Sequence, residues 1–210
     1  MKHNEHYHYE EFARAAGYRL VAGGDEAGRG PWAGPVYAAF VILDEGKRIE
    51  GLDDSKKLSR RRRRELFEQI CSEALAFGIG TASPEEIDRI NILEATRLAF
   101  QRAFEGLQQR PDYVLLDYIK LPWLRLPHQA FARGESISAS VAAASILAKE
   151  ARDLYMEEVA QMYPKYGFEK HMGYGTAMQR AGPMLEQCLL VRRRTVAHVL
   201  FKPEKKAVAR

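Results

Sequence analysis

The chain is organised around the stretch Gly23-Gly24-Asp25-Glu26-Ala27-Gly28-Arg29-Gly30-Pro31-Trp32-Ala33-Gly34-Pro35-Val36. A largely apolar segment, residues 18–22, leads directly into the two adjacent carboxylates. The glycines and prolines that surround and follow them keep the backbone from forming a helix. The pattern therefore predicts a strand that carries chemistry at its end.

Asp25 and Glu26 are neighbours, and this constrains how they share a site. Adjacent side chains of a regular strand point to opposite faces, so a shared site requires a turn of the chain or the backbone carbonyl of Glu26. Carboxylates held close together repel each other unless one is protonated or a cation lies between them. Their oxygens favour Mg²⁺ or Mn²⁺. Arg29, between two glycines, can present its guanidinium and nearby N–H groups to a phosphate or a sugar.

The run Gly24–Gly30, followed by Gly34-Pro35-Val36, resembles the signature of the type 2 ribonucleases H, the ribonuclease HII family. Members of this family cut a duplex at embedded ribonucleotides. A Gly-rich nucleotide-binding enzyme is a rival interpretation. It is disfavoured because the glycines do not follow G-x-G-x-x-G and the chain contains no G-x-x-x-x-G-K-[ST] loop.

Length and composition suit one sizeable domain, or one domain with a small appendage, since 46% of the 210 residues are hydrophobic. The net charge of +4 suits a polyanionic partner without requiring one. The N-terminal residues are polar and no segment is long and apolar enough for a membrane span, so we expect a cytoplasmic protein with no membrane contact. Basic residues bunch at 56–57, 60–64, 192–194 and 205–206, which indicates either a solvated face or a nucleic-acid surface.

A third carboxylate, Asp117, ends the apolar run of residues 112–116. A strand that follows a helix and ends in an acid places that acid at the carboxyl edge of a sheet, where open α/β folds keep their sites. From the residues alone, a helix cap or turn aspartate is the alternative. The resemblance implies the third metal ligand of the family, although Tyr118 stands where many members have glycine.

The fourth carboxylate of the family is an aspartate just before a helix of small residues, which here is expected over residues 137–162. The matching position is Glu135, whose longer side chain leaves two roles open: direct metal ligation, or a water-mediated or product-release role. Asp153 is the rival candidate. We favour Glu135 and interpret Asp153 as a neighbour of the site or a member of an ion pair.

The resemblance also implies a substrate-binding set. The polar loop 51–58 resembles an element that lies near the nucleic-acid backbone. The loop 163–176 interleaves basic and aromatic residues, a pattern typical of sugar or base stacking. The glycine-arginine-glycine run would sense the 2′-hydroxyl group, and a tyrosine would pack at the RNA-to-DNA junction. The predicted substrate-binding residues are Gly28, Arg29, Gly30, Ser55, Lys56 and Tyr174.

The order of predicted elements indicates an α/β fold. Two strands with a hairpin signal at residues 44–46 precede a helix over 60–76 that Ser59 caps. A third strand and a helix over 84–109, started by Ser83-Pro84-Glu85-Glu86, come next. The resemblance implies a ribonuclease H-like central mixed sheet flanked by helices, with a C-terminal helical part. We expect a flexible segment at 1–17, the catalytic domain at 18–160, and a substrate-gripping part with a basic tail at 161–210.

The resemblance implies an endoribonuclease that hydrolyses the RNA strand of RNA/DNA hybrids and cuts 5′ of single ribonucleotides in duplex DNA. Asp25, Glu26 and Asp117, helped by Glu135, would hold two Mg²⁺ or Mn²⁺ ions about 4 Å apart. The products would carry 3′-hydroxyl and 5′-phosphate ends, and the activity would serve ribonucleotide removal in replication and repair.

Two alternatives frame this prediction. Ribonuclease HIII adds an N-terminal substrate-binding domain, and the 24 residues before Asp25 are too few for one, so we expect type HII. A nucleic-acid-binding module with a dead site is the rival from another class, and the intact carboxylates argue against it. We expect a monomer. A sliding clamp is a partner that the family suggests, but residues 202–210 show no clear docking motif.

Overall fold

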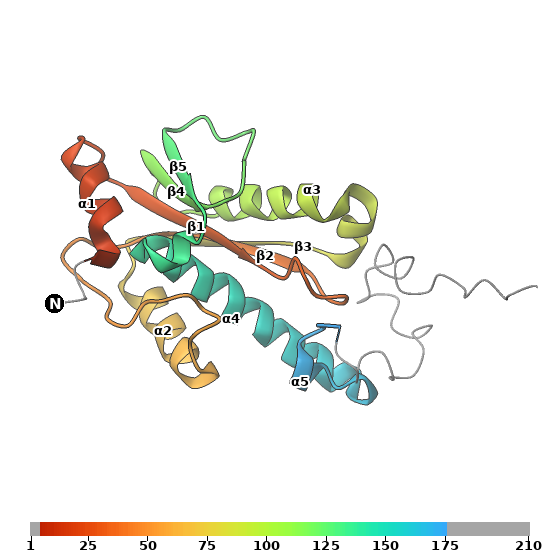
Figure 1. Cartoon of the computed structure of the whole chain (residues 1–210). Coiled ribbons are helices and arrows are strands. Elements are labelled where there is room, and N and C mark those ends of the chain that lie inside the picture. Colours follow the sequence, from red (N-terminus) through yellow and green to blue (C-terminus); the bar gives the residue numbers. More distant parts are fainter. Residues whose placement is uncertain (1–4, 176–210) are drawn as a thin grey trace, which may run out of the picture.

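The computed structural model describes residues 5–175, in which five strands form one mixed sheet with the order β3-β2-β1-β4-β5 (Figure 1). β1 pairs antiparallel with β2, and β2 pairs antiparallel with β3. β1 and β4 run parallel, as do β4 and β5. The strands are β1 (Val21–Ala27), β2 (Val36–Ile42), β3 (Ala76–Ala82), β4 (Tyr113–Asp117) and β5 (His128–Phe131).

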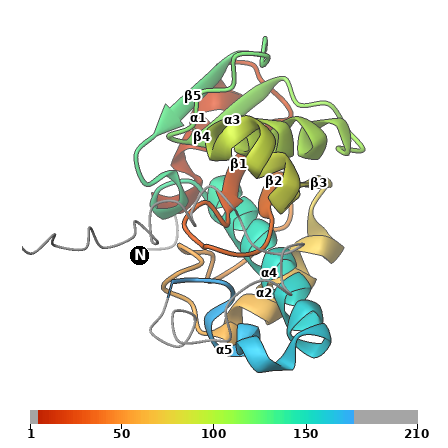
Figure 2. The same ribbon diagram turned by 90° about the vertical axis from the view of Figure 1, so that its right-hand side faces the viewer.

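Helices cover both faces of this sheet. α3 packs on one face and α4, with α2 beside it, packs on the other (Figures 1 and 2). This arrangement confirms the α/β class and the sheet flanked by helices. The α-helices are α1 (His8–Ala15), α2 (Arg60–Glu73), α3 (Pro84–Glu105), α4 (Ala139–Met162) and α5 (Phe168–His171), and the short 3₁₀ helices are η1 (Glu5–Tyr7), η2 (Gly134–Ser136) and η3 (Pro164–Tyr166).

Small residues let the helices approach the strands at backbone distance. A methyl group added to Gly23 of β1 would lie 2.1 Å from the carbonyl carbon of Ser140 in α4. Added to Gly78 or Gly80 of β3, it would lie 2.1 or 2.2 Å from a carbonyl oxygen of α3. The alanine-rich part of α4 is buried along this contact, which confirms the expected close packing of the small-residue helix.

The helix starts follow the sequence signals, and the ends differ from them. Ser59 accepts a hydrogen bond from the Arg62 amide, and Ser83 forms a capping box with Glu86. α2 ends at residue 73 instead of 76. α3 ends at residue 105 instead of 109 and is interrupted at Asn91, whose φ is 68°. The expected end of α2 at residue 76 overlaps the first residue of β3, and α3 ends just before Gly106, a residue with low helix propensity.

The position of the hairpin was predicted wrongly. The turn at Asp44, whose Oδ1 accepts a hydrogen bond from the Gly46 amide at 2.9 Å, leads into a loop and then α2. The hairpin instead joins β1 to β2 through residues 28–35, and β1 extends through both carboxylates to Ala27. Local turn chemistry marks where the chain bends, and sheet pairing decides which strands meet.

Residues 5–15 also differ from the predicted flexible segment. They form η1 and α1, and Glu10 is only 1% exposed. The Tyr7 hydroxyl accepts a hydrogen bond from the Ile49 amide at 3.0 Å. These partners lie far along the chain, so local patterns gave no sign of them. The boundaries at 17 and 160 stay predictions, and residues 176–210, with both C-terminal basic runs, lie outside the described residues.

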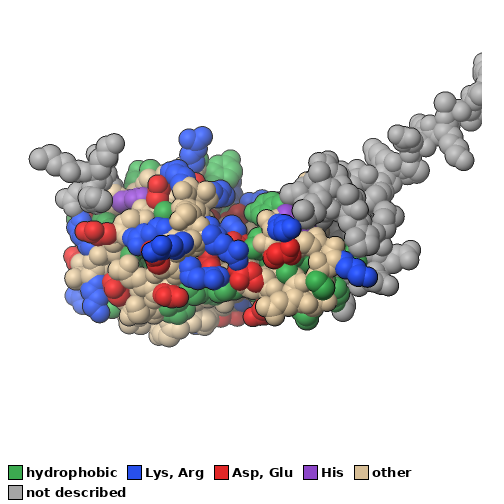
Figure 3. Space-filling model, turned by 90° about the horizontal axis from the view of Figure 1, so that it is seen from below, with side chains coloured by type: hydrophobic (Ala, Val, Ile, Leu, Met, Phe, Trp, Pro, Cys, Tyr) green, Lys and Arg blue, Asp and Glu red, His purple; other side chains and the backbone are tan. Residues whose placement is uncertain are grey.

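The arginine run that begins α2 is paired with acids of this chain. Acidic side chains lie among the basic ones on the face formed by α2 and α4 (Figure 3). Internal ion pairs account for all five arginines, but the side chains of four of them stay 42–91% exposed, and only Arg63 is buried. The interpretation as a solvated face is therefore confirmed for these four, and a nucleic-acid surface at this run stays a prediction. The pairs are Arg60 with Glu157, Arg61 and Arg62 with Glu65, Arg63 with Glu150 and Asp153, and Arg64 with Glu150 and Glu157.

Among residues 5–175, none of the helices combines the length and the apolar character that crossing a membrane requires.

Candidate active site

The parallel pairing of β1 and β4 brings the first and third carboxylates together. The last paired positions are Gly24 and Leu116, so Asp25 and Asp117 are the next residues on neighbouring strands. Neighbouring strands lie about 4.8 Å apart, and equivalent positions of parallel strands point to the same face. That face is the one on which α4 packs, because Gly23, two residues before Asp25, contacts α4.

Asp25 is buried at the end of β1, with 7% of its surface exposed. Its Oδ1 accepts a hydrogen bond from the Glu26 amide at 2.7 Å. Burial raises the pKa of Asp25 well above its usual value, and the negative charges of Glu26, Asp117 and Glu135 raise it further. The site is therefore short of positive charge at its centre.

Glu26 leaves the strand on the opposite face, because β1 stays extended through both carboxylates. Burial raises its pKa, and Arg29, whose Nη1 lies 3.1 Å from Oε1, acts in the opposite direction. The other oxygen, Oε2, is buried and has no hydrogen-bond partner within the described part of the chain. The turn that would have brought both side chains to one face is absent between residues 21 and 27.

Glu135 lies in η2, immediately before α4, and is 6% exposed. The neighbouring Gly134 amide donates to Oδ1 of Asp117 at 2.8 Å, which ties this turn to the end of β4. Burial raises the pKa of Glu135, and the charge of Asp117 contributes. Its Oε2 is buried without a hydrogen-bond partner among residues 5–175. The structure therefore places Glu135 with the other carboxylates.

Asp153 lies elsewhere in the molecule and is fully engaged. It forms ion pairs with Arg63, at 3.0 Å, and with Lys149. The interpretation of Asp153 as an ion-pair member is confirmed.

The carboxylate cluster, defined as Asp25, Glu26, Asp117 and Glu135, has the chemistry of a divalent-cation site. Its donors are all carboxylate oxygens, which Mg²⁺ and Mn²⁺ prefer. Oε2 of Glu135 is buried without a partner among the described residues, and the pKa values of Asp25 and Glu135 are raised, so a cation beside these two acids would relieve unfavourable charge. Within residues 5–175, however, no three His, Cys, Asp or Glu side chains are close enough together to hold one metal ion. The residues fit the cation chemically, and full coordination requires side-chain movement or further ligands.

Two predicted substrate residues lie in the loop beside the cluster. Ser55 is 5% exposed, whereas the Lys56 side chain is exposed. Partial burial lowers the pKa of Lys56, but Asp54, Asp25, Glu135 and Asp117 outweigh this and raise it overall. Lys56 is thus a cation positioned within the field of the cluster.

The glycine-arginine-glycine run and Tyr174 also meet. A methyl group added to Gly30 would lie 3.7 Å from Cε1 of Tyr174, so the ring packs beside that backbone. Gly28 has a φ of +100°, a conformation that favours glycine. Beneath both segments lies Arg152, which no sequence pattern singled out. Its partners are backbone carbonyls of distant residues, so nothing local marks it.

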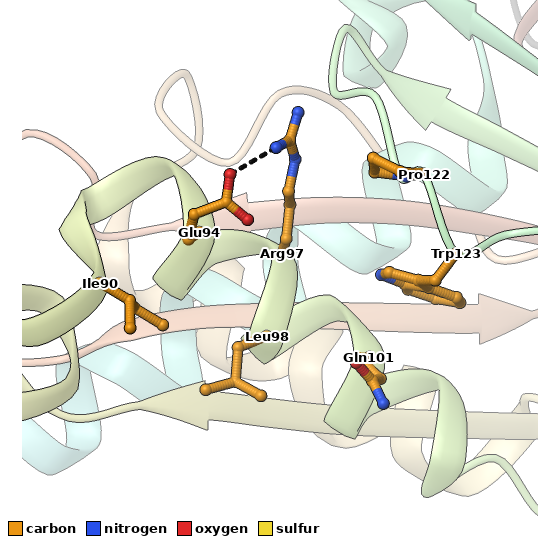
Figure 4. A pocket seen from close by; sticks show the side chains of 7 residues that line it. All are labelled: Ile90, Glu94, Arg97, Leu98, Gln101, Pro122 and Trp123. Carbon is orange, nitrogen blue, oxygen red and sulfur yellow. Dashed lines mark hydrogen bonds and ion pairs between the residues drawn. The ribbon is translucent and has the colours of Figure 1, made fainter.

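One pocket lies on the α3 side of the sheet and is separate from the carboxylate cluster (Figure 4). It has a volume of about 440 Å³ and contains none of the four carboxylates. The seven lining residues belong to α3 and the 122–123 turn: Ile90, Glu94, Arg97, Leu98, Gln101, Pro122 and Trp123. The candidate active site is therefore the carboxylate cluster at the sheet edge and not this pocket.

Comparison with known proteins gives a consistent family. The family model described as Ribonuclease HII matches residues 22–203. Ribonuclease HII of Desulfitobacterium hafniense (strain Y51) is 51% identical over 171 residues, which cover 79% of this chain and 66% of that protein. The chain thus spans just under two thirds of that relative's length. Ribonuclease HII of Delftia acidovorans is 52% identical over 184 residues, covering 86% of this chain and 78% of the relative.

Solved structures share the fold. The ribonuclease H2 of Pyrococcus horikoshii OT3 superposes with a TM-score of 0.64 at 28% identity, over 77% of this chain and 83% of that one. The RNase HII in the PCNA:RNase HII complex of Archaeoglobus fulgidus gives 0.63 at 27% identity, over 77% and 85%. Bst-RNase HIII in complex with Mn²⁺ gives 0.64 at 18% identity, over 86% and 68%, and shows the fold alone. The ribonuclease H-like fold expected from the sequence is confirmed.

Proposed function

Because the chain belongs to the ribonuclease HII family, we propose that it is a metal-dependent endoribonuclease. It hydrolyses the RNA strand of RNA/DNA hybrids and cuts 5′ of single ribonucleotides in duplex DNA, leaving 3′-hydroxyl and 5′-phosphate ends. The observation that carries the proposal is the parallel register of β1 and β4, which sets Asp25 beside Asp117 where Glu135 also lies. The activity serves ribonucleotide removal in replication and repair.

The carboxylate cluster holds the divalent cations in this proposal. Asp25 and Asp117 contribute side chains from one face, and Glu135 contributes from the turn before α4. The sequence left two ways for Glu26 to join the site: a turn that brings its side chain to the same face as Asp25, or ligation through its backbone carbonyl. Since β1 is extended and the Glu26 side chain points to the other face, the backbone carbonyl is the better candidate ligand. Mg²⁺ or Mn²⁺ at such a site would activate the attacking water and stabilise the leaving 3′-oxygen. A structural neighbour was solved with Mn²⁺.

The remaining residues bind and orient the substrate. Lys56 lies in the field of the cluster and would neutralise part of the phosphate charge. Gly28, Arg29 and Gly30 present backbone and guanidinium groups to the 2′-hydroxyl, and the Tyr174 ring beside Gly30 packs on the sugar or base. Ser55, in the same loop, would lie near the nucleic-acid backbone. The protein acts as a cytoplasmic monomer. The Archaeoglobus fulgidus neighbour was solved in complex with PCNA, and association of this chain with a sliding clamp stays a prediction.

The test is cleavage of a DNA duplex that contains one ribonucleotide, with Mg²⁺, with Mn²⁺ and with EDTA. Asp117→Asn is expected to cut at least about 100-fold more slowly, because losing even an indirect partner of a metal ligand costs 10- to 100-fold. Asp44→Asn is the matched control. It makes the same chemical change in the turn after β2, at the end of the sheet opposite Asp25, and should retain full activity.

The position of the cut and the choice of substrate complete the test. Metal-dependent cutting on the 5′ side of the ribonucleotide supports the proposal. If neither this duplex nor a long RNA/DNA hybrid is cut while both are bound, the nuclease proposal fails and the chain is a binding module. The ratio of the two cutting rates measures the preference for single ribonucleotides.

A further inference from the structure

Arg152 is a fully buried arginine, 0% exposed, in the middle of α4. Its guanidinium donates three hydrogen bonds to backbone carbonyls: Nε to Pro35 at 3.1 Å, Nη2 to Ala33 at 3.0 Å, and Nη1 to Met172 at 3.0 Å. Two of these carbonyls belong to the loop between β1 and β2, and the third belongs to the segment after α5. A buried charge is unfavourable unless it is well hydrogen-bonded. The three bonds to backbone carbonyls compensate the burial of this guanidinium and connect it to both segments.

The same two segments contact each other directly above Arg152. The Trp32 amide donates to the Gly173 carbonyl at 2.8 Å, and the Ala33 amide donates to the same oxygen at 3.3 Å. A methyl group on Gly173, whose φ is +80°, would lie 2.5 Å from the Ala33 carbonyl oxygen. The two segments therefore touch at backbone distance, with the guanidinium of Arg152 bound to both.

The proposed recognition groups sit on this assembly. A methyl group on Gly28 would lie 2.5 Å from Nε of Arg152, so the backbone of Gly28 rests on the guanidinium. The Cζ atom of Arg152 lies 5.8 Å from the centroid of the Tyr174 ring, within the range of a cation–π contact. The ring of Tyr174 in turn packs beside Gly30.

We propose that Arg152 is a positioning residue, which fixes the Gly28–Pro35 loop and the Met172–Tyr174 segment against each other so that Gly30 and Tyr174 form one surface for the ribonucleotide. The identity of the bound nucleotide rests on the proposed function, whereas the coupling of the two segments does not. Arginine suits this role because its planar fork offers five donors in fixed directions. A lysine carries its three donors on a single nitrogen, so it cannot replace Nε, Nη1 and Nη2, which reach the three carbonyls from separate positions.

The first test uses fluorescence and needs no activity. The chain has two tryptophans, so Trp123→Phe leaves Trp32 as the single reporter. A methyl group on Gly175 would lie 2.3 Å from Trp32 ring atoms, so the segment after Met172 covers this ring. In the Trp123→Phe background, Arg152→Lys is expected to shift Trp32 emission to longer wavelength and to increase quenching by acrylamide. Arg102→Lys is the matched control, since Arg102 also donates to a backbone carbonyl but lies on α3.

The second test measures whether Arg152 acts through Tyr174. Arg152→Lys should lower kcat/KM on the single-ribonucleotide duplex about 100-fold, the cost of a misplacement of about 1 Å. Tyr174→Ala should lower it about tenfold, the value of a stacking contact. In the Arg152→Lys background, Tyr174→Ala should change kcat/KM less than about twofold, because the ring is already displaced. A residue that only stabilises the fold would give independent, multiplicative losses.

The outcomes separate the two proposals. Unchanged Trp32 fluorescence in Arg152→Lys, or multiplicative losses with Tyr174→Ala, overturns the positioning role. If Arg152→Lys alters Trp32 fluorescence but the unsubstituted protein cuts neither substrate, the coupling of the two segments is supported and only the proposed function fails. If Arg152→Lys does not fold, Gly173→Ala takes its place, since its methyl group forces the segments apart while Arg152 stays. It should reproduce the fluorescence change and the loss of the Tyr174 effect, and a wild-type result overturns the proposal.

Discussion

Replacing Glu10 with alanine is expected to destabilise the protein by about 3 kcal/mol, although Glu10 lies in a segment with no sequence signal for burial. Oε1 of Glu10 accepts hydrogen bonds from the Ser138 hydroxyl at 2.6 Å, the Ser140 amide at 2.8 Å and the Ser140 hydroxyl at 2.6 Å. The carboxylate thus satisfies the first turn of α4 from a helix about 130 residues away.

The magnitude follows from these contacts. A hydrogen bond to a charged group contributes roughly 1.5–3 kcal/mol, so three independent bonds would give about 4.5–9 kcal/mol. The bonds share one oxygen and are not independent. In Glu10→Ala, α1 can detach, and water can then form hydrogen bonds with Ser138 and Ser140. The loss of stability therefore cannot exceed the free energy with which α1 is bound to the rest of the protein. A single N-cap contact contributes about 0.5–2 kcal/mol. The three bonds that share one oxygen should exceed this value and fall short of three independent bonds, so we expect a total of about 3 kcal/mol.

Chemical denaturation of Glu10→Ala, with Glu11→Ala as the control, measures this difference. Glu11 is the next residue of the same helix, is 46% exposed at its side chain and pairs with Arg48, so its loss should cost at most about 0.5 kcal/mol. Hydrogen exchange at the Ser140 amide should accelerate in Glu10→Ala and not in Glu11→Ala. Unfolding free energies of the two variants within about 1 kcal/mol of each other would refute the reasoning.

Two further predictions concern the pH dependence of stability. Burial, reinforced by Glu26, raises the pKa of Asp25, so the folded state binds its proton more tightly than the unfolded state and stability falls as pH rises above 3.8 through the raised pKa. Asp25→Asn should therefore melt at a higher temperature than wild type at pH 7, lose that advantage below pH 3.8, and gain less from added Mg²⁺. Conversely, the hydrogen bonds from Arg102 lower the pKa of Glu86 from 4.5 to about 2, so its contribution is present above pH 4.5 and lost as pH falls toward 2. The stability difference between wild type and Glu86→Gln should shrink over that interval, and a difference that does not change with pH would contradict the ion pair as its cause.

The sequence predicts the parts of the fold that local patterns encode. The caps at Ser59 and Ser83 mark two helix starts, and the apolar run that ends in Asp117 marks β4. The order of helix, strand and acid along the chain is enough to expect Asp117 at the carboxyl edge of the sheet. Only the pairing of β1 with β4 in the structure shows that it lies beside Asp25. Contacts between distant segments escape such reasoning. The partners of Glu10 are 128 and 130 residues away, and those of Arg152 include carbonyls 117 and 119 residues away.

The arginine run of α2 shows why composition alone misleads. Five adjacent basic residues would suit a polyanion as well as a solvated face, yet each finds an acid in a position that only a helical turn or the docking of α2 on α4 creates. Arg63 is nearly buried between Glu150 and Asp153. Removing one partner of such a buried pair costs about 3–5 kcal/mol. The run therefore anchors α2, and the cationic groups found beside the carboxylate cluster are Lys56, in the loop before α2, and Arg29, which bonds Glu26.

α4 connects these observations because three separate regions depend on it. Its first turn binds Glu10. This turn follows η2, which contains Glu135 and whose Gly134 amide donates a hydrogen bond to Asp117. Its middle carries Glu150 and Asp153, which fix α2 and the Ser55–Lys56 loop attached to it. Arg152, between those two acids in sequence, holds the segments of Gly30 and Tyr174. The alanines of α4 are buried against the sheet, and the backbone of its first turn touches Gly23 of β1, so a displacement of the helix would disturb this packing. A rigid helix of this kind sets the distances between the carboxylates, the lysine loop and the proposed ribonucleotide surface, so a shift of α4 should affect binding and cutting together.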